Sequence, residues 1–129
     1  MEISEALARK VLETVDAPHR QNYLGRLTWA LLLALEGKKT EALREMDEQT
    51  LTFAGASYLG PLQPAEVYAV VSDTAKALEW LGRAVRLGDE REDWLRRDPH
   101  LATIRDHPRF QQIVDSIAYR RKQRLPPRN

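Results

Sequence analysis

The sequence predicts an all-α protein built from repeated pairs of helices. In several segments apolar residues recur every three or four positions, which is the period of an amphipathic helix. Residues 37–43 (GKKTEAL) align with residues 72–78 (SDTAKAL), and the matching alanines, Ala42 and Ala77, lie 77 − 42 = 35 positions apart. No segment alternates apolar and polar residues as a half-buried strand does. Helix pairs with a period in the mid-thirties are typical of solenoids, which usually bind other molecules.

Length and composition limit the classes of protein that fit the chain. Its 129 residues suit one domain, and 20 basic and 19 acidic residues give a net charge of +1, unlike a polyanion-binding protein. The lack of cysteine excludes disulfides and thiolate metal sites. The longest apolar run, residues 29–35, has seven residues, whereas a bilayer crossing needs about 20. The N-terminus does not resemble a signal peptide, so we expect a cytoplasmic protein without a membrane partner.

The first two helices are predicted over residues 4–16 and 21–36. Ser4 can cap the first helix, and Pro18 ends it because the residue before a proline is disfavoured in the α region. The second segment is apolar on nearly every side, so we expect neighbouring helices to enclose it. Gly37 follows this segment and can adopt the left-handed conformation that closes a helix.

A third helix and a central loop come next. The helix is predicted from a cap at Thr40 to about residue 52, with three residues facing inward: Ala42, Leu43 and Met46. Residues 53–64 are rich in glycine and proline, which predicts a loop with a short helical turn at residues 56–59.

The fourth and fifth helices form a second pair. The fourth is short and is predicted over residues 65–71. The fifth is predicted to start at a cap formed by Asp73 or Thr74 and to run to about residue 87. Gly88 is expected to stop it.

The C-terminal part holds an acidic linker and two elements that begin with proline. Residues 89–93 are predicted to form the solvated linker. Asp98 and Asp106 are each followed within two residues by a proline, a pattern typical of a helix start. The apolar residues expected to face inward from these two elements are Leu101, Ile104, Phe110, Ile113, Val114 and Ile117.

Positions shared by the two helix pairs resemble the tetratricopeptide repeat (TPR) motif. That motif has small residues where helices approach closely and large residues where adjacent repeats meet. The second pair supplies Ala65, Tyr68, Ala77, Leu81 and Ala84. The first pair supplies Ala30, Leu33, Gly37, Ala42 and Met46. Gln49 stands where the motif has alanine, and Ser72 where it has a turn glycine.

Residues 94–117 are similar to the ends of TPR arrays in bacterial signalling proteins, including serine/threonine kinases and winged-helix regulators. There the segment is a capping helix pair. The resemblance implies a right-handed solenoid in one domain, with a leading helix (1–17), a first repeat (22–55), a second repeat (56–88), a capping region (89–124) and a tail (125–129). It leaves open whether the chain is the end of a longer protein with an upstream effector domain.

The resemblance also implies a binding groove on the concave face, which the first helix of each pair would line. The candidate groove residues are Leu24, Leu27, Leu31, Leu35, Leu62, Glu66, Ala69 and Val70. A mainly apolar face suits an amphipathic helix or an apolar peptide from a partner protein. We therefore expect a non-enzymatic protein-interaction module with a regulatory or scaffolding role. The alternatives are that the chain's own first or last helix covers the groove, or that a second copy does so in a homodimer.

A basic C-terminal tail suggests a weaker alternative. Arg120, Arg121, Lys122 and Arg124 could contact nucleic acid or anionic lipid. No aromatic residue follows Tyr119 to stack on bases. A solvated helix end, whose cations favour the negative pole of the helix dipole, explains the same pattern and is preferred.

Metal binding, cofactor binding and catalysis are not predicted. His100 and His107 lie beside Asp98 and Asp106, but these aspartates are expected to serve as helix caps. A metal site needs ligands that converge in space. The sequence contains no nucleophile, phosphate-loop or dinucleotide motif. We expect at least two of the three tryptophans, Trp29, Trp80 and Trp94, to be largely buried packing residues.

Overall fold

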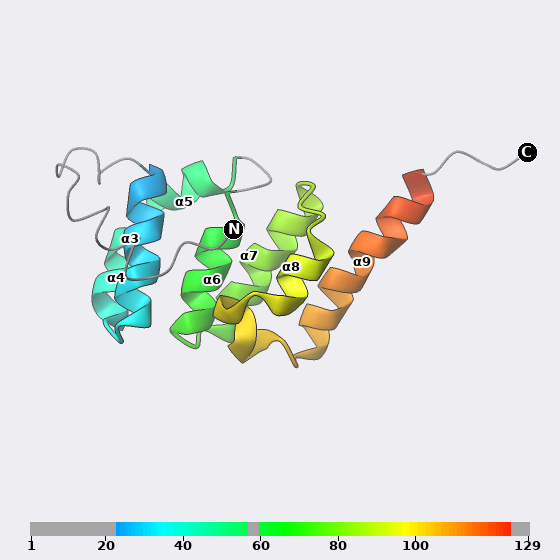
Figure 1. Ribbon diagram of the computed structural model, residues 1–129. Helices are drawn as coiled ribbons and strands as arrows, with labels where there is room; N and C mark the ends of the chain where they lie inside the picture. The colour runs from blue at the N-terminus through cyan, green and yellow to red at the C-terminus, as the bar shows by residue number, and fades with distance from the viewer. Residues whose placement is uncertain (1–22, 57–59, 125–129) are drawn as a thin grey trace, which may run out of the picture.

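A computed structural model describes residues 23–56 and 60–124, in which helices and turns occur but no strand (Figure 1). The prediction of an all-α fold is therefore confirmed for these residues. The elements are α3 (Tyr23–Leu35), α4 (Lys39–Glu45), α5 (Glu48–Ala54), α6 (Leu62–Val70), α7 (Thr74–Arg86), α8 (Glu92–Arg97), the 3-10 helix η1 (Pro99–Ile104) and α9 (Pro108–Arg124). The predicted leading helix, the turn at 57–59 and the tail 125–129 lie outside the described residues.

The helices lie in two layers, as three successive pairs in a row (Figure 1). The first layer contains α3, α6 and η1, and the second contains α4, α7 and α9. Within the first layer α6 packs between α3 and η1, while α7 packs against α9 in the second. Two short helices are additional: α5 contacts α3 and α6, and α8 contacts η1 and α9.

The spacing of the helices is nearly constant along the chain. First-layer helices end at Leu35, Val70 and Ile104, which are 35 and 34 positions apart (70 − 35 and 104 − 70). Second-layer helices begin at Lys39, Thr74 and Pro108, again 35 and 34 positions apart (74 − 39 and 108 − 74). The region predicted to cap the array therefore continues its period through η1 and α9. These two elements, which we call the third pair, are joined through α7 and α8, which each contact both, and do not pack closely on each other as α3 does on α4 or α6 on α7.

Hydrogen bonds between successive pairs show the same period. Each joins residues 34 or 35 positions apart: Gln63 Nε2 to Thr28 Oγ1 at 3.2 Å, Thr103 Oγ1 to the Ala69 carbonyl at 2.7 Å, and Arg120 Nη1 to the Val85 carbonyl at 2.6 Å. Equivalent positions of neighbouring pairs therefore lie next to one another. Two of the three bonds end on carbonyl groups near the C-terminal end of a helix, and these carbonyls also accept a backbone N–H from the following turn, Ser72 to Ala69 and Gly88 to Val85, both at 3.1 Å.

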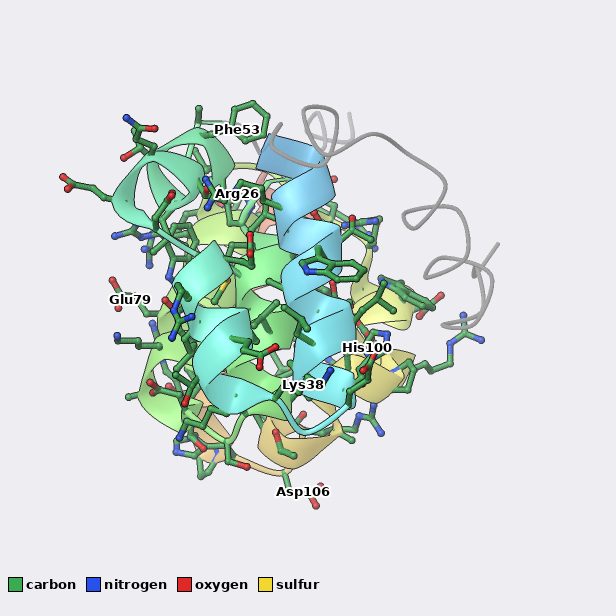
Figure 2. All side chains as sticks on the ribbon, turned by 90° about the vertical axis from the view of Figure 1, so that its left-hand side faces the viewer. Arg26, Lys38, Phe53, Glu79, His100 and Asp106 are labelled. Carbon is green, nitrogen blue, oxygen red and sulfur yellow. The ribbon has the colours of Figure 1, made fainter. Side chains whose placement is uncertain are left out.

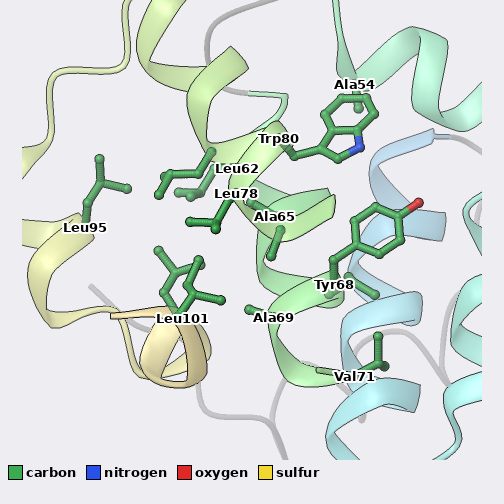
Figure 3. Close-up of a cluster of buried hydrophobic side chains, with 14 of the residues drawn as sticks. Ala54, Leu62, Ala65, Tyr68, Ala69, Val71, Leu78, Trp80, Leu95 and Leu101 are labelled. Atoms are coloured by element: carbon green, nitrogen blue, oxygen red, sulfur yellow. The ribbon is translucent and has the colours of Figure 1, made fainter. Parts of the chain in front are cut away.

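Small residues lie where the helices make contact. The fully buried alanines include Ala30, Ala42, Ala65, Ala77 and Ala84, as the repeat pattern predicts. Ala54 and Ala69 are also fully buried, and Figure 3 shows large side chains beside them: Trp80 of α7 lies near Ala54 and Tyr68, and Leu101 of η1 lies near Ala69. The methyl side chain of alanine lets two backbones approach closely, so the larger neighbours fill the remaining space.

The third pair closes the core with large residues. Its predicted inward-facing residues are all buried: Leu101, Ile104, Phe110, Ile113, Val114 and Ile117. Trp80 is also buried, at 6% exposure, whereas Trp29 and Trp94 are partly buried and pack against the core. The tryptophans are thus packing residues.

The predicted third helix is wrong in one respect, because it breaks at Met46 and Asp47. Asp47 has an extended backbone, and its carboxylate accepts a 2.9 Å hydrogen bond from the Thr50 N–H, which makes it the N-cap of α5. Aspartate is a strong N-cap, so this interaction competes with continuation of α4. Arg26 of α3, labelled in Figure 2, stabilises the break through ion pairs with Glu45 and Asp47 at 3.3 and 2.9 Å.

Several helices begin at other residues than the sequence predicts, each for a local reason. Lys38, not Thr40, precedes α4, and no side chain caps that helix. Helix α6 begins at Leu62 and includes Pro64 in its first turn, where a missing N–H removes no intrahelical bond. Helix α8 begins inside the predicted acidic linker. At α9 the ring nitrogen of His107, not Asp106, accepts the N–H of Arg109 at 3.0 Å.

Other predicted boundaries are confirmed. Asp73 caps α7 by accepting the Lys76 N–H, and Asp98 caps η1 by accepting the His100 N–H. Gly37 has φ +81°, the left-handed conformation expected at a helix end. Ser72, in the equivalent turn of the next pair, has φ +67° although it carries a Cβ. The geometry of this turn is therefore kept without glycine.

Overpacking one alanine contact should test its role. Ala77→Leu should lower the free energy of unfolding by about 1–3 kcal/mol, because a fully buried position has no room for three more carbons. Ala75→Leu on the exposed side of α7 is the matched control and should change stability by less than about 0.5 kcal/mol. Urea unfolding followed by circular dichroism measures both. Equal losses would show that Ala77 is not a close contact.

The cap at the α4–α5 break predicts a pH dependence. The Thr50 N–H, together with the charge of Arg26, lowers the pKa of Asp47 below its ordinary value of 3.8. A lowered native pKa stabilises the fold above the unfolded pKa, and this contribution disappears as the pH falls through the native value. Asp47→Asn should therefore be less stable than wild type at about pH 6, and the difference should shrink as the pH falls through the ordinary value of 3.8 and then through the lowered native pKa of Asp47.

Urea midpoints measured across this pH range provide the test. Asp106→Asn, at an exposed position, should follow the wild-type profile. A constant difference between Asp47→Asn and wild type at every pH would contradict a titrating cap.

Candidate functional site

Four of the eight predicted groove residues belong to the core. Leu27, Leu62 and Glu66 are at most 7% exposed, and Ala69 is fully buried. These positions lie on α3 and α6, which pack directly against each other, and η1 covers α6 from the other side. They therefore present no surface to a partner in this conformation.

Three predicted groove residues remain partly exposed. Leu31 and Leu35 lie on α3, and Val70 lies at the end of α6. Leu35 and Val70 are separated by one period of 70 − 35 = 35 residues, so they occupy equivalent positions in successive pairs. Leu24 also lies in α3, but its side chain is outside the described residues. We call Leu31, Leu35 and Val70 the apolar face.

A second feature, separate from the apolar face, is a polar cluster between α6 and η1. Glu66 from α6 and Asp98 and His100 from η1 and its cap place one possible ligand atom each within 4.8 Å of one another. His100, labelled in Figure 2, is partly exposed, whereas Glu66 and Asp98 are 7% and 0% exposed. From the sequence, Asp98 and His100 stand out as neighbours, whereas Glu66 is expected in the groove, because nothing local links Glu66 to a residue 32 positions later (98 − 66).

Asp89 and Arg91 form an ion pair beside this cluster. The Asp89 side chain is 0% exposed, and Arg91 donates to it from Nε and Nη2 at 2.9 and 2.8 Å. The hydrogen bonds from Arg91 to Asp89 raise the pKa of Arg91, and the charges of Asp89, Glu66 and Asp98 add to this effect. Asp89 is thus a buried, paired residue and not part of a solvated linker.

The basic tail makes contacts within the chain. Arg120 donates to the Val85 carbonyl at 2.6 Å, Arg121 donates to the Glu90 carbonyl, and Arg124 forms an ion pair with the Glu90 carboxylate. These contacts fix α9 to the end of α7 and the segment after it. Cations that are already hydrogen-bonded are poorer ligands for phosphate groups, so the arrangement favours the structural interpretation of the tail.

Comparisons with known proteins assign no family to the chain: no family model, curated protein or solved structure matches it. Among the described helices, none combines the length and apolar character that crossing a bilayer requires.

Removing Arg91 should leave the buried Asp89 carboxylate without its ion-pair partner and so destabilise the fold. Arg91→Met should lower the free energy of unfolding by about 2 kcal/mol, less than for a fully buried pair because the arginine side chain is 46% exposed. Arg96→Met breaks ion pairs with Asp115 at 2.7 Å and Glu92 at 3.3 Å, and because the Asp115 side chain is 67% exposed and Arg96 itself is 34% exposed it should cost less than about 1 kcal/mol.

Chemical unfolding at neutral pH measures both variants. The double variant Asp89→Asn/Arg91→Met should recover part of the loss, because no unpaired charge remains buried. If Arg91→Met and Arg96→Met were equally mild, Asp89 would not depend on Arg91.

Proposed function

We propose that this chain is a TPR-like solenoid that acts as a non-enzymatic protein-interaction module. The apolar face formed by Leu31, Leu35 and Val70 would bind an amphipathic helix or an apolar peptide of a partner protein. The period of 34 or 35 residues and the buried alanines at the helix contacts support the TPR-like assignment.

The observation that carries the proposal is the repetition of partly exposed apolar residues at equivalent positions of one layer. Leu35 and Val70 lie one period apart, and Leu31 lies one helical turn before Leu35. Side chains four positions apart share a face of a helix, and the two helices pack side by side. An apolar strip that continues over neighbouring helices fits a helix-in-groove mode of recognition.

The biological setting follows from the resemblance of the C-terminal region to TPR arrays of bacterial signalling proteins. In such a protein the module would recruit a partner or hold an effector domain in position, in the cytoplasm. The close approach of the three helix pairs supports a scaffolding role, since a rigid surface loses little entropy when a partner binds.

A homodimer is the alternative, because the same apolar face could be covered by a second copy. The two hypotheses differ in concentration dependence. Self-association raises the mass measured by sedimentation equilibrium as protein concentration increases, whereas a monomeric module keeps one mass. The contacts of Arg120, Arg121 and Arg124 within the chain make nucleic-acid binding the less favoured function.

Peptide selection tests the proposed function. A library of random peptides displayed on phage should yield amphipathic sequences that bind the full chain, and fluorescence anisotropy gives their affinity. The double variant Leu35→Glu/Val70→Glu should bind them at least about tenfold more weakly, because each buried contact of this size contributes about 1–2 kcal/mol. Circular dichroism should show unchanged helicity.

Leu87→Glu is the matched control. Leu87 is 47% exposed and lies at the end of α7, away from the apolar face, so its replacement should leave peptide affinity unchanged. Failure to select any peptide would count against the proposal, as would equal loss in both variants. A wild-type dimer that Leu35→Glu/Val70→Glu converts to a monomer would establish the homodimer instead.

A further inference from the structure

The cluster of Glu66, Asp98 and His100 has the composition of a metal site. One carboxylate oxygen from each acid and a ring nitrogen of His100 lie within 4.8 Å of one another. These ligands come from two elements: Glu66 lies in the middle of α6, and Asp98 and His100 lie at the start of η1. Glu66 is far from Asp98 and His100 in the sequence, and the packing of η1 on α6 brings the three side chains together.

The carboxylate of Asp98 provides an independent indication of a ligand. Asp98 is 0% exposed, and its Oδ1 accepts the His100 N–H at 2.9 Å. Its Oδ2 is also buried but has no hydrogen-bond partner among the described residues. A buried acceptor without a partner costs free energy, and in most structures a water, an ion or a donor satisfies it.

The neighbouring guanidinium groups make their hydrogen bonds elsewhere. Arg91 donates to Asp89 through two nitrogens. Arg105 donates to the backbone carbonyl of Asp98 at 2.6 Å, and its Nε is buried without an acceptor. Neither arginine donates to Asp98 Oδ2. The two possible occupants of this space are a metal ion bound to the carboxylates and a water that bridges Arg105 Nε to Asp98 Oδ2.

We propose that Glu66, Asp98 and His100 bind a divalent transition-metal ion, with Zn²⁺ as the probe. Carboxylate oxygen and imidazole nitrogen together suit zinc, manganese and iron, whereas a calcium site would use oxygen ligands alone. Metal–ligand distances of about 2.0–2.2 Å place two ligand atoms no more than about 4.4 Å apart. The ligand atoms here lie within 4.8 Å of one another, close to this limit, and the partly exposed His100 ring has room to adjust when an ion binds.

A bound ion would connect the second helix pair to the third. Glu66 belongs to the second pair, and Asp98 and His100 belong to the third. Binding to the folded chain alone would stabilise it in proportion to the logarithm of the metal concentration. This role is separate from the proposed protein binding, which depends on Leu31, Leu35 and Val70.

Isothermal titration of the chelator-treated full chain with ZnCl₂ at pH 7.5 tests the site. Wild type should bind one zinc ion per chain, and thermal unfolding should move to higher temperature as zinc is added. Glu66→Gln and His100→Asn should each weaken zinc binding at least about tenfold and abolish the thermal shift, because each removes a ligand.

His107→Asn is the matched control. His107 lies at a similar helix start but is not part of the cluster, and asparagine can replace its capping contact with the Arg109 N–H. This variant should bind zinc as wild type does. Asp98→Asn would change both a metal ligand and the N-cap of η1, so its effect on zinc binding could not be separated from its effect on the helix.

Two results would overturn the proposal. The first is the absence of a one-to-one binding isotherm with Zn²⁺ in wild type. The second is wild-type zinc affinity in Glu66→Gln and His100→Asn, provided that circular dichroism shows both variants to be folded. In either case a bridging water would account for the buried atoms of Asp98 and Arg105, and peptide binding would remain to be judged on its own experiment.

Discussion

Close contact between helices at alanine positions is the constraint on which the rest of the structure depends. Ala42, Ala65, Ala77 and Ala84 have no exposed surface. A methyl group at these positions lets the helix backbones approach, and the distance between packed helices is set by the side chains at their contact. The two complete pairs can therefore stack with a constant spacing, and large residues such as Trp80 fill the space beside the small ones.

The third pair keeps the same spacing along the chain but packs through different side chains. Its second-layer helix, α9, packs through Phe110, Ile113 and Val114, whereas α7 uses alanines for its contacts. Polar bonds to α6 and α7 carbonyls, from Thr103 and Arg120, fix the register. The alanine pattern that reveals the first two pairs is missing here, so the sequence resembles a cap although the geometry continues the array.

The packing of adjacent helices also determines which side chains remain exposed and can bind a partner. The TPR motif would place Leu27 and Leu62 on a concave binding face. Because the adjacent helices pack closely here, both side chains are buried in the core. The face that remains is the strip of Leu31, Leu35 and Val70. The same packing of η1 on α6 buries the carboxylates of Glu66 and Asp98 beside the partly exposed His100. An apolar strip and a polar cluster thus arise from one arrangement of helices.

The sequence by itself determined the all-α class, several helix boundaries, the period and many of the inward-facing residues, because helical periodicity, capping residues and proline act within a few positions of the chain. It did not determine the helix break at Asp47, where Arg26 of another helix stabilises a local cap. Nor did it determine the burial of Glu66 beside Asp98 and His100. Both depend on contacts between residues more than 20 positions apart, and only the stacking of the helix pairs brings such residues together.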